Sequence, residues 1–120
     1  MSLNALLSLR VLTPDGLILE ETSLTSVNIP LVAGGNIGIR PGHAPLIAET
    51  ALGWIKYRKN KEQFEVQFHS GIVNIRNNVV LILTAGKVSD TNSFQEDTSN
   101  LEYERLMQSL LKKMTPKKDD

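Results

Sequence analysis

Residues 71–83, GIVNIRNNVVLIL, decide the fold class of this 120-residue chain. Two runs rich in valine, isoleucine and leucine flank Asn77-Asn78, a pair that is favoured in the type I′ turn of a β-hairpin. The second run, residues 79–83, is almost wholly apolar, as expected of a strand that is covered on both faces. We therefore predict a hairpin whose second strand lies in the centre of a sheet.

The chain on the N-terminal side of this hairpin repeats the same pattern back to Leu7. Short β-branched or aliphatic runs alternate with turn residues roughly every 8 to 12 positions, which is typical of a sandwich or barrel. Residues 13–16 (TPDG) supply the turn of a first hairpin, because proline and glycine favour its backbone angles. We predict a mainly β protein, a sandwich of about eight to ten strands over residues 4–86.

The composition changes after Gly86. Residues 87–98 are polar and predict a solvated linker, whereas apolar side chains then recur at helical spacing until Pro116. We predict one helix over residues 99–115, followed by a charged tail, residues 116–120. Because so short a helix is marginal alone, its apolar stripe must pack either on the sandwich or on another protein, and both alternatives stay open.

Composition excludes several classes of function. The length suits one compact domain, and thirteen basic residues balance thirteen acidic ones, so no net field attracts nucleic acid or an anionic membrane. The absence of cysteine excludes disulfides and thiolate chemistry. No apolar run approaches the roughly 18 residues of a membrane span, and no signal peptide begins the chain, which predicts a soluble, cytoplasmic protein.

The most unusual stretch is residues 33–45, AGGNIGIRPGHAP, which contains four of the eight glycines and two of the five prolines. So many turn residues predict one loop of defined shape. Gly34-Gly35 do not form a phosphate loop, because no Lys-Ser or Lys-Thr follows them. His43 lacks the local carboxylate and nucleophile that a general base needs. We predict no catalytic residue and no cofactor.

Other candidate sites are equally weak. His69 precedes Ser70, but adjacent strand residues point to opposite faces and cannot act as base and nucleophile. Two distant histidines without a cysteine or a calcium-loop spacing predict no metal site. One patch could bind single-stranded nucleic acid, although the neutral net charge favours a solvated hairpin. Its residues are Trp54, Lys56, Tyr57, Arg58, Lys59 and Lys61.

The pattern GIxPGHAP of residues 38–45 resembles the hallmark of the epsilon subunit of F-type ATP synthases, called delta in mitochondria. The resemblance runs in register over roughly the first 86 residues. It implies a flattened ten-stranded β-sandwich that couples the gamma subunit to the ring of c subunits in a proton- or sodium-driven rotor. It also implies no catalysis, only indirect contact with the catalytic alpha/beta head, and a peripheral position on the cytoplasmic face of the bacterial inner membrane without membrane insertion.

The resemblance also implies roles within residues 33–45. The implied c-ring contacts are Asn36, Ile37, Arg40 and His43. The implied loop-shaping residues are Gly34, Gly35, Gly38, Pro41, Gly42 and Pro45. Alternatively, all ten only form the turn. The chain departs from the family at Asn36, where an acidic residue is usual, and in the stretch from Pro30 to His43, which is one residue longer.

The largest departure is at the C-terminal end. The family often has a two-helix hairpin there that inhibits ATP hydrolysis and in some members binds ATP. A single helix of about 22 Å, at 1.5 Å per residue, cannot reach as far, so we expect weak or no inhibition and no ATP site. The alternative function is a free-standing sandwich that binds a small ligand or single-stranded nucleic acid, which requires a deep pocket or a coherent basic face.

Overall fold

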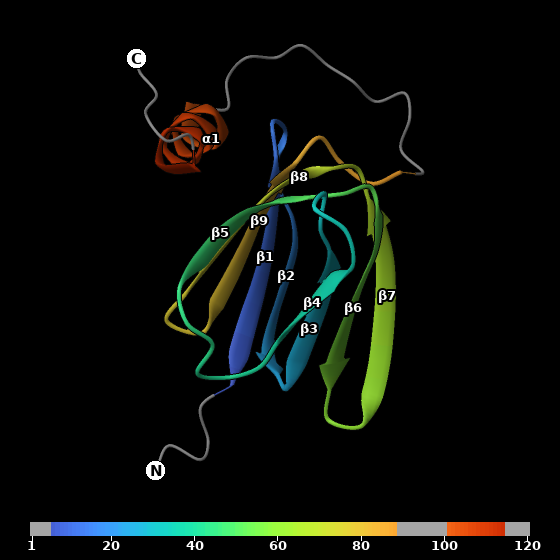
Figure 1. Cartoon of the computed structure of the whole chain (residues 1–120). Helices are drawn as coiled ribbons and strands as arrows, with labels where there is room; N and C mark the ends of the chain where they lie inside the picture. The colour runs from blue at the N-terminus through green and yellow to red at the C-terminus, as the bar shows by residue number, and fades with distance from the viewer. Residues whose placement is uncertain (1–5, 89–100, 115–120) are drawn as a thin grey trace.

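A computed structural model describes residues 6–88 and 101–114 of the chain. In these residues nine strands form two facing sheets, and one helix lies outside them (Figure 1), so the predicted sandwich with a C-terminal helix is confirmed. The elements are β1 (Leu7–Thr13), β2 (Gly16–Leu24), β3 (Ser26–Pro30), β4 (Asn36–Ile39), β5 (Leu46–Thr50), β6 (Gly53–Lys59), β7 (Glu62–Phe68), β8 (Gly71–Arg76), β9 (Val79–Thr84) and α1 (Leu101–Met114). The predicted tail 116–120, residues 89–98 of the predicted linker, and residues 4, 5, 99, 100 and 115 lie outside the described part.

The five-stranded sheet has the order β2-β1-β9-β8-β5 and the four-stranded sheet the order β4-β3-β6-β7. Strand β9 is the middle strand of the larger sheet, which confirms the prediction from its apolar sequence. It pairs in parallel with β1 and antiparallel with β8. Asn77 and Asn78 have φ angles of 52° and 65°, as the type I′ turn between β8 and β9 requires.

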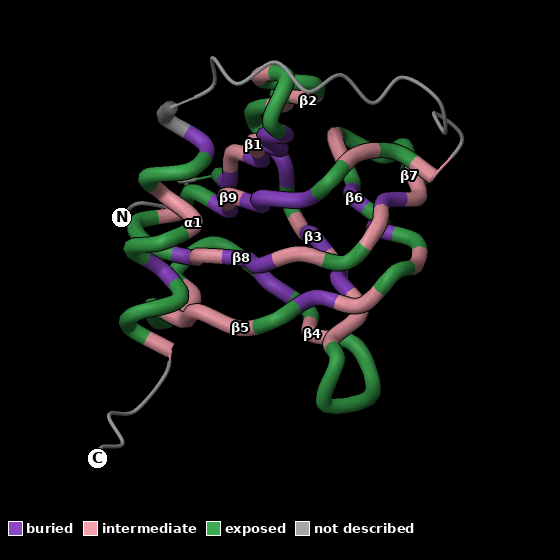
Figure 2. The backbone as a smooth tube through the Cα atoms, turned by 90° about the horizontal axis from the view of Figure 1, so that it is seen from above, coloured by how far each residue is buried: buried purple, intermediate pink, exposed green. Residues whose placement is uncertain are grey.

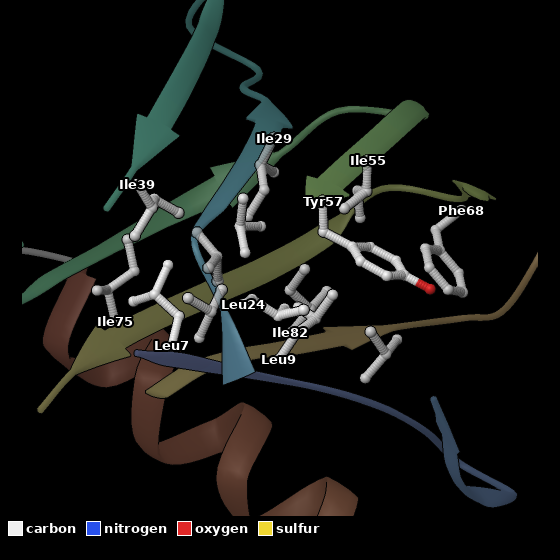
Figure 3. Packing of buried hydrophobic residues seen from close by; sticks show 14 residues of the cluster. Leu7, Leu9, Leu24, Ile29, Ile39, Ile55, Tyr57, Phe68, Ile75 and Ile82 are labelled. Carbon is white, nitrogen blue, oxygen red and sulfur yellow. The ribbon is translucent and has the colours of Figure 1, made fainter. Parts of the chain in front are cut away.

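The main core lies between the two sheets. Alternate residues of each strand point inward, because successive side chains of a strand face opposite ways. Leu7, Leu9 and Val11 of β1 are fully buried there. Ile29 and Tyr57 of the smaller sheet lie on the other side of Leu7 and Leu9 (Figure 3). This interdigitated layer fixes the two sheets relative to each other.

A second core lies on the outer face of the five-stranded sheet, beneath α1. Leu12, Ile72 and Leu83 contribute from the sheet, and Tyr103 and Leu110 contribute from the helix. Viewed from above, the helix runs along one side of the molecule next to β8 and β5 (Figure 2). Of the two alternatives that the sequence left open, the structure therefore shows packing of the helix on its own sandwich.

Candidate functional site

Residues 33–45 are not one loop, and that prediction is wrong. Strand β4 occupies Asn36–Ile39 and pairs antiparallel with β3 along its whole length. The stretch is extended because Ile39 is fully buried and Ile37 also packs against the main core. One turn therefore precedes β4 and a second follows it at the other end of the strand (Figure 1), roughly 13 Å away at about 3.3 Å per residue.

The first turn covers residues 31–35. The Gly34 N–H donates to the Leu31 carbonyl, and the Leu31 N–H donates to the Gly35 carbonyl, both at 3.0 Å. Gly34 and Gly35 have φ angles of 113° and 75°, which side chains with a Cβ rarely adopt. Because a Cβ on either glycine would have open space around it, the backbone angles, not crowding, require glycine here.

The second turn covers residues 40–43. The His43 N–H donates to the Arg40 carbonyl at 3.1 Å, with Pro41 second and Gly42 third in the turn. A φ of 89° at Gly42 makes this a type II turn. The Gly42 N–H also donates to Asn78 Oδ1 at 2.8 Å, so the connection between the two sheets is tied to the β8–β9 turn.

Asn78 has a second role that the sequence analysis missed. The sequence analysis identified it as half of a type I′ turn, but its side chain also accepts a hydrogen bond from Gly42, which is 36 residues away in the sequence. No local pattern predicts a contact over that separation. The signal in the sequence was the turn pair itself, which leaves an amide side chain free to reach a neighbouring loop.

The structure brings together two of the four implied c-ring residues and separates them from a third. Arg40 is exposed and His43 half-buried in the second turn, where His43 Nδ1 lies 2.7 Å from the Ala44 carbonyl oxygen. Asn36 is exposed at the other end of β4, opposite Pro30. Ile37 lies opposite Ile29 and packs against the core. Pro45 directly precedes β5.

The His69–Ser70 pair that the sequence analysis considered lies directly before β8. The carbonyls of His69 and Ser70 accept hydrogen bonds from the buried Thr84 hydroxyl at 2.7 and 3.2 Å, which fixes the turn before β8.

Within residues 6–88 and 101–114, no group of three or more His, Asp or Glu side chains could hold a metal ion. The helix that the structure describes is not long and apolar enough to cross a membrane.

The basic and aromatic patch of the sequence is divided between two environments. Tyr57 is buried and stacks on Phe64 with ring centroids 5.2 Å apart. Burial raises the pKa of Tyr57, and the Glu21 carboxylate raises it further. Lys59 Nζ lies 3.5 Å from Glu21 Oε1. Trp54, by contrast, is half exposed. Tyr57 and Lys59 are therefore not available to a nucleic-acid face, whereas Trp54, Lys56 and Arg58 are exposed on the outer face of the sheet.

A known protein family matches this domain. The family model described as "ATP synthase, Delta/Epsilon chain, beta-sandwich domain" matches residues 6–89. These residues include all nine strands.

Curated relatives with the name ATP synthase epsilon chain match most of the chain. The protein from Lawsonia intracellularis is 36% identical over 78 residues, which are 65% of this chain and 57% of that protein. The protein from Prochloron didemni is 30% identical over 105 residues, which are 87% of this chain and 74% of that protein. The matched part therefore spans little more than half the length of the Lawsonia relative.

Solved structures share the fold at low identity. A chain of the Euglena gracilis mitochondrial ATP synthase, OSCP/F1/c-ring, has a TM-score of 0.63 at 19% identity. The similarity covers 95% of this chain and 69% of that chain. A chain of the Tetrahymena thermophila mitochondrial ATP synthase, central stalk/c-ring, has a TM-score of 0.58 at 12% identity, with 96% of its length and 91% of this chain covered.

Proposed function

The chain belongs to the delta/epsilon chain family of ATP synthase, and from this premise we propose that it is a non-catalytic central-stalk subunit that couples gamma to the c ring. The match over residues 6–89 carries the proposal. The proposed position is peripheral, on the cytoplasmic face of a bacterial inner membrane. Contact with the catalytic alpha/beta head is indirect, and the coupling ion is a proton or sodium.

The packing of the sandwich supports a coupling role. A subunit that transmits rotation should deform little under load, and tightly packed interiors have low compressibility. Two sheets share one buried core, and the hydrogen bond from Gly42 to Asn78 ties the connection between β4 and β5 to the larger sheet. These features hold the candidate contact residues on a rigid frame.

We propose that the c-ring contact is an edge of the sandwich. Strand β4 is the outer strand of its sheet, so Asn36, Ile37, Arg40 and His43 follow one another along that edge, with an open glycine turn at one end. The absence of Cβ atoms at Gly34 and Gly35 allows another backbone to approach closely.

We further propose that this chain inhibits ATP hydrolysis weakly or not at all. Tyr103 and Leu110 of α1 are buried against the sheet, and extension of the helix toward another subunit would expose both. Burial of these apolar side chains therefore favours the docked position of the helix over an extended one.

The experiment is a titration of the chain against the catalytic sector of its own synthase, which contains gamma, with binding and ATP hydrolysis recorded together. Tight binding with little change in rate is the expected result. Absence of binding would contradict the coupling role, whereas tight binding with strong inhibition would contradict only the proposal about the helix.

The edge contact is tested separately with the isolated c ring and gamma. Arg40→Ala should weaken assembly with the c ring several-fold, because it removes a charged contact. Arg105→Ala removes another exposed arginine, from the helix, and is the matched control. Equal affinities of the two variants would exclude Arg40 from the contact.

A further inference from the structure

The outer face of the four-stranded sheet has a stripe of three exposed side chains along β6. Trp54, Lys56 and Arg58 point outward, whereas Ile55 and Tyr57 between them are buried. The members lie roughly 7 Å apart, since every second residue of a strand shares a face. We call Trp54, Lys56 and Arg58 the β6 stripe.

On the β3 side, the residues beside the β6 stripe are polar. Asn28 lies opposite Lys56, and Ser26 lies opposite Arg58. On the other side of Asn28 is Gly38, and a Cβ at that glycine would meet Asn28 Nδ2 at 3.8 Å. Amide and hydroxyl groups therefore flank the two cations on this side.

The two cations of the β6 stripe are available to a partner. The ion pairs among the described residues are Arg10–Glu20 and Lys59–Glu21, so within that part of the chain neither Lys56 nor Arg58 pairs with a carboxylate. Glu65 is opposite Lys56 on β7 and lowers the local positive potential without forming that contact. The stripe has two positive charges next to one half-exposed indole.

We propose that the β6 stripe docks an acidic surface of a protein partner, with Trp54 as its apolar anchor. Tryptophan and arginine are enriched among the residues that dominate protein interfaces, and complementary charge gives such contacts their specificity and speed of association. The partner is a neighbouring subunit of the ATP synthase stalk, an assignment that rests on the proposed function above.

A protein partner fits this surface better than single-stranded nucleic acid. Nucleic-acid grooves stack successive bases on several aromatic side chains. Here Tyr57 faces the core and stacks on Phe64, which leaves Trp54 as the stripe's single aromatic ring. Lys59 points to the opposite face from Arg58, because the two are adjacent in the strand, and it pairs with Glu21.

The test measures binding of the full chain to the gamma–c-ring assembly of its own synthase at low and high salt. The variant K56E/R58E should bind about tenfold more weakly at low salt, because like charges would then face each other. This difference should shrink at high salt, which screens exposed charges. The control K112E/K113E makes the same charge change on exposed residues of α1 and should change affinity less than about twofold.

A second variant raises the positive potential. Glu65→Gln removes the carboxylate opposite Lys56 and should tighten binding about twofold to threefold at low salt. Circular dichroism of every variant checks that the sandwich is intact. Equal affinities of wild type, K56E/R58E and Glu65→Gln would overturn the docking proposal.

Two further outcomes separate this inference from the proposed function. Failure of the wild-type chain to bind the gamma–c-ring assembly would overturn the proposed function and, with it, the identity of the partner. Binding of oligothymidine by the wild type that is lost in K56E/R58E would overturn the protein partner in favour of nucleic acid.

Discussion

The outer faces of the two sheets differ in what covers them. The five-stranded sheet has an apolar outer face, with Leu12, Ile72 and Leu83 buried beneath α1. The four-stranded sheet presents Lys56 and Arg58 on its outer face, both exposed. A strand that is apolar on both faces requires a cover on both faces, whereas an alternating strand tolerates water on one. The outward residues of a strand therefore predict whether a sheet face is covered.

Glycine substitutions give the largest expected difference between the sheets. A Cβ at Gly71, in the five-stranded sheet, would overlap the Leu83 carbonyl and lie 2.9 Å from Thr84 Cα. Backbone atoms cannot move aside as a flexible side chain can, so Gly71→Ala should lower the free energy of unfolding by about 3 kcal/mol or more. Chemical denaturation of the purified variant measures this loss.

The matched control is Gly38→Ala on the outer face of the four-stranded sheet, which we call the open face; the outer face of the five-stranded sheet, beneath α1, is the covered face. Its Cβ would be in ordinary contact with Asn28 Nδ2, and the φ angle of Gly38 is not positive. The free energy of unfolding should change by less than about 1 kcal/mol. Similar losses in the two variants would show that the crowding at Gly71 does not set the cost.

Truncation of a side chain on each outer face gives the next largest effect. Leu83→Ala removes a fully buried side chain from beneath α1 and should cost about 3 kcal/mol of unfolding free energy, as buried leucines do. Trp54→Ala removes a larger side chain from the open face, but half of it is exposed, so we expect a loss of about 1 kcal/mol. Thermal and urea denaturation compare the two. A larger cost for Trp54→Ala would mean that the open face is also structural.

Alkaline pH should act on the covered face through Tyr103. Burial against the sheet raises the pKa of Tyr103, and the neighbouring Glu104 carboxylate raises it further. The folded state therefore holds the hydroxyl proton more tightly than the unfolded state. The stabilisation is complete below the ordinary tyrosine pKa of about 10 and is lost as the pH rises through the higher folded value.

The measurement is the helical circular dichroism signal between about pH 9 and 12, together with NMR titration of the labelled Tyr103 ring. In the wild type the signal should fall as the ring ionises. Tyr103→Phe cannot ionise and should keep its helical signal to higher pH. Identical pH curves for both proteins would show that docking of the helix does not depend on the ionisation of Tyr103.

The sequence predicted the elements whose signals are local. Residues 13–16, the pair Asn77-Asn78 and the apolar run of β9 each determine a turn or a strand through neighbouring residues, and the structure confirms them. Strand β4 was missed because it has four residues, one of them Gly38, between two glycine-containing turns. Local composition outweighed the alternation of Ile37 and Ile39, which is the signal that identifies it.

The arrangement of the candidate site depends on contacts that no local pattern encodes. The sequence contained the type II turn, since Pro41-Gly42 favours it, but not the bond from Gly42 to Asn78. The sequence analysis placed Asn36 and Arg40 in one loop because it did not predict strand β4 between the two turns. Docking of α1 was left open because an amphipathic helix fits any apolar surface of suitable shape.

The smallest expected effect is the loss of charge from the open face. Lys56→Gln and Arg58→Gln, singly or together, should change the free energy of unfolding by less than about 0.5 kcal/mol, because both side chains are exposed and form no ion pair with another residue that the structure describes. Denaturation at low and high salt measures the change. A loss above about 1 kcal/mol that disappears at high salt would mean that Glu65 stabilises Lys56 across the strands. In that case the open face, like the covered one, would contribute to folding, and its charges would not be free for a partner.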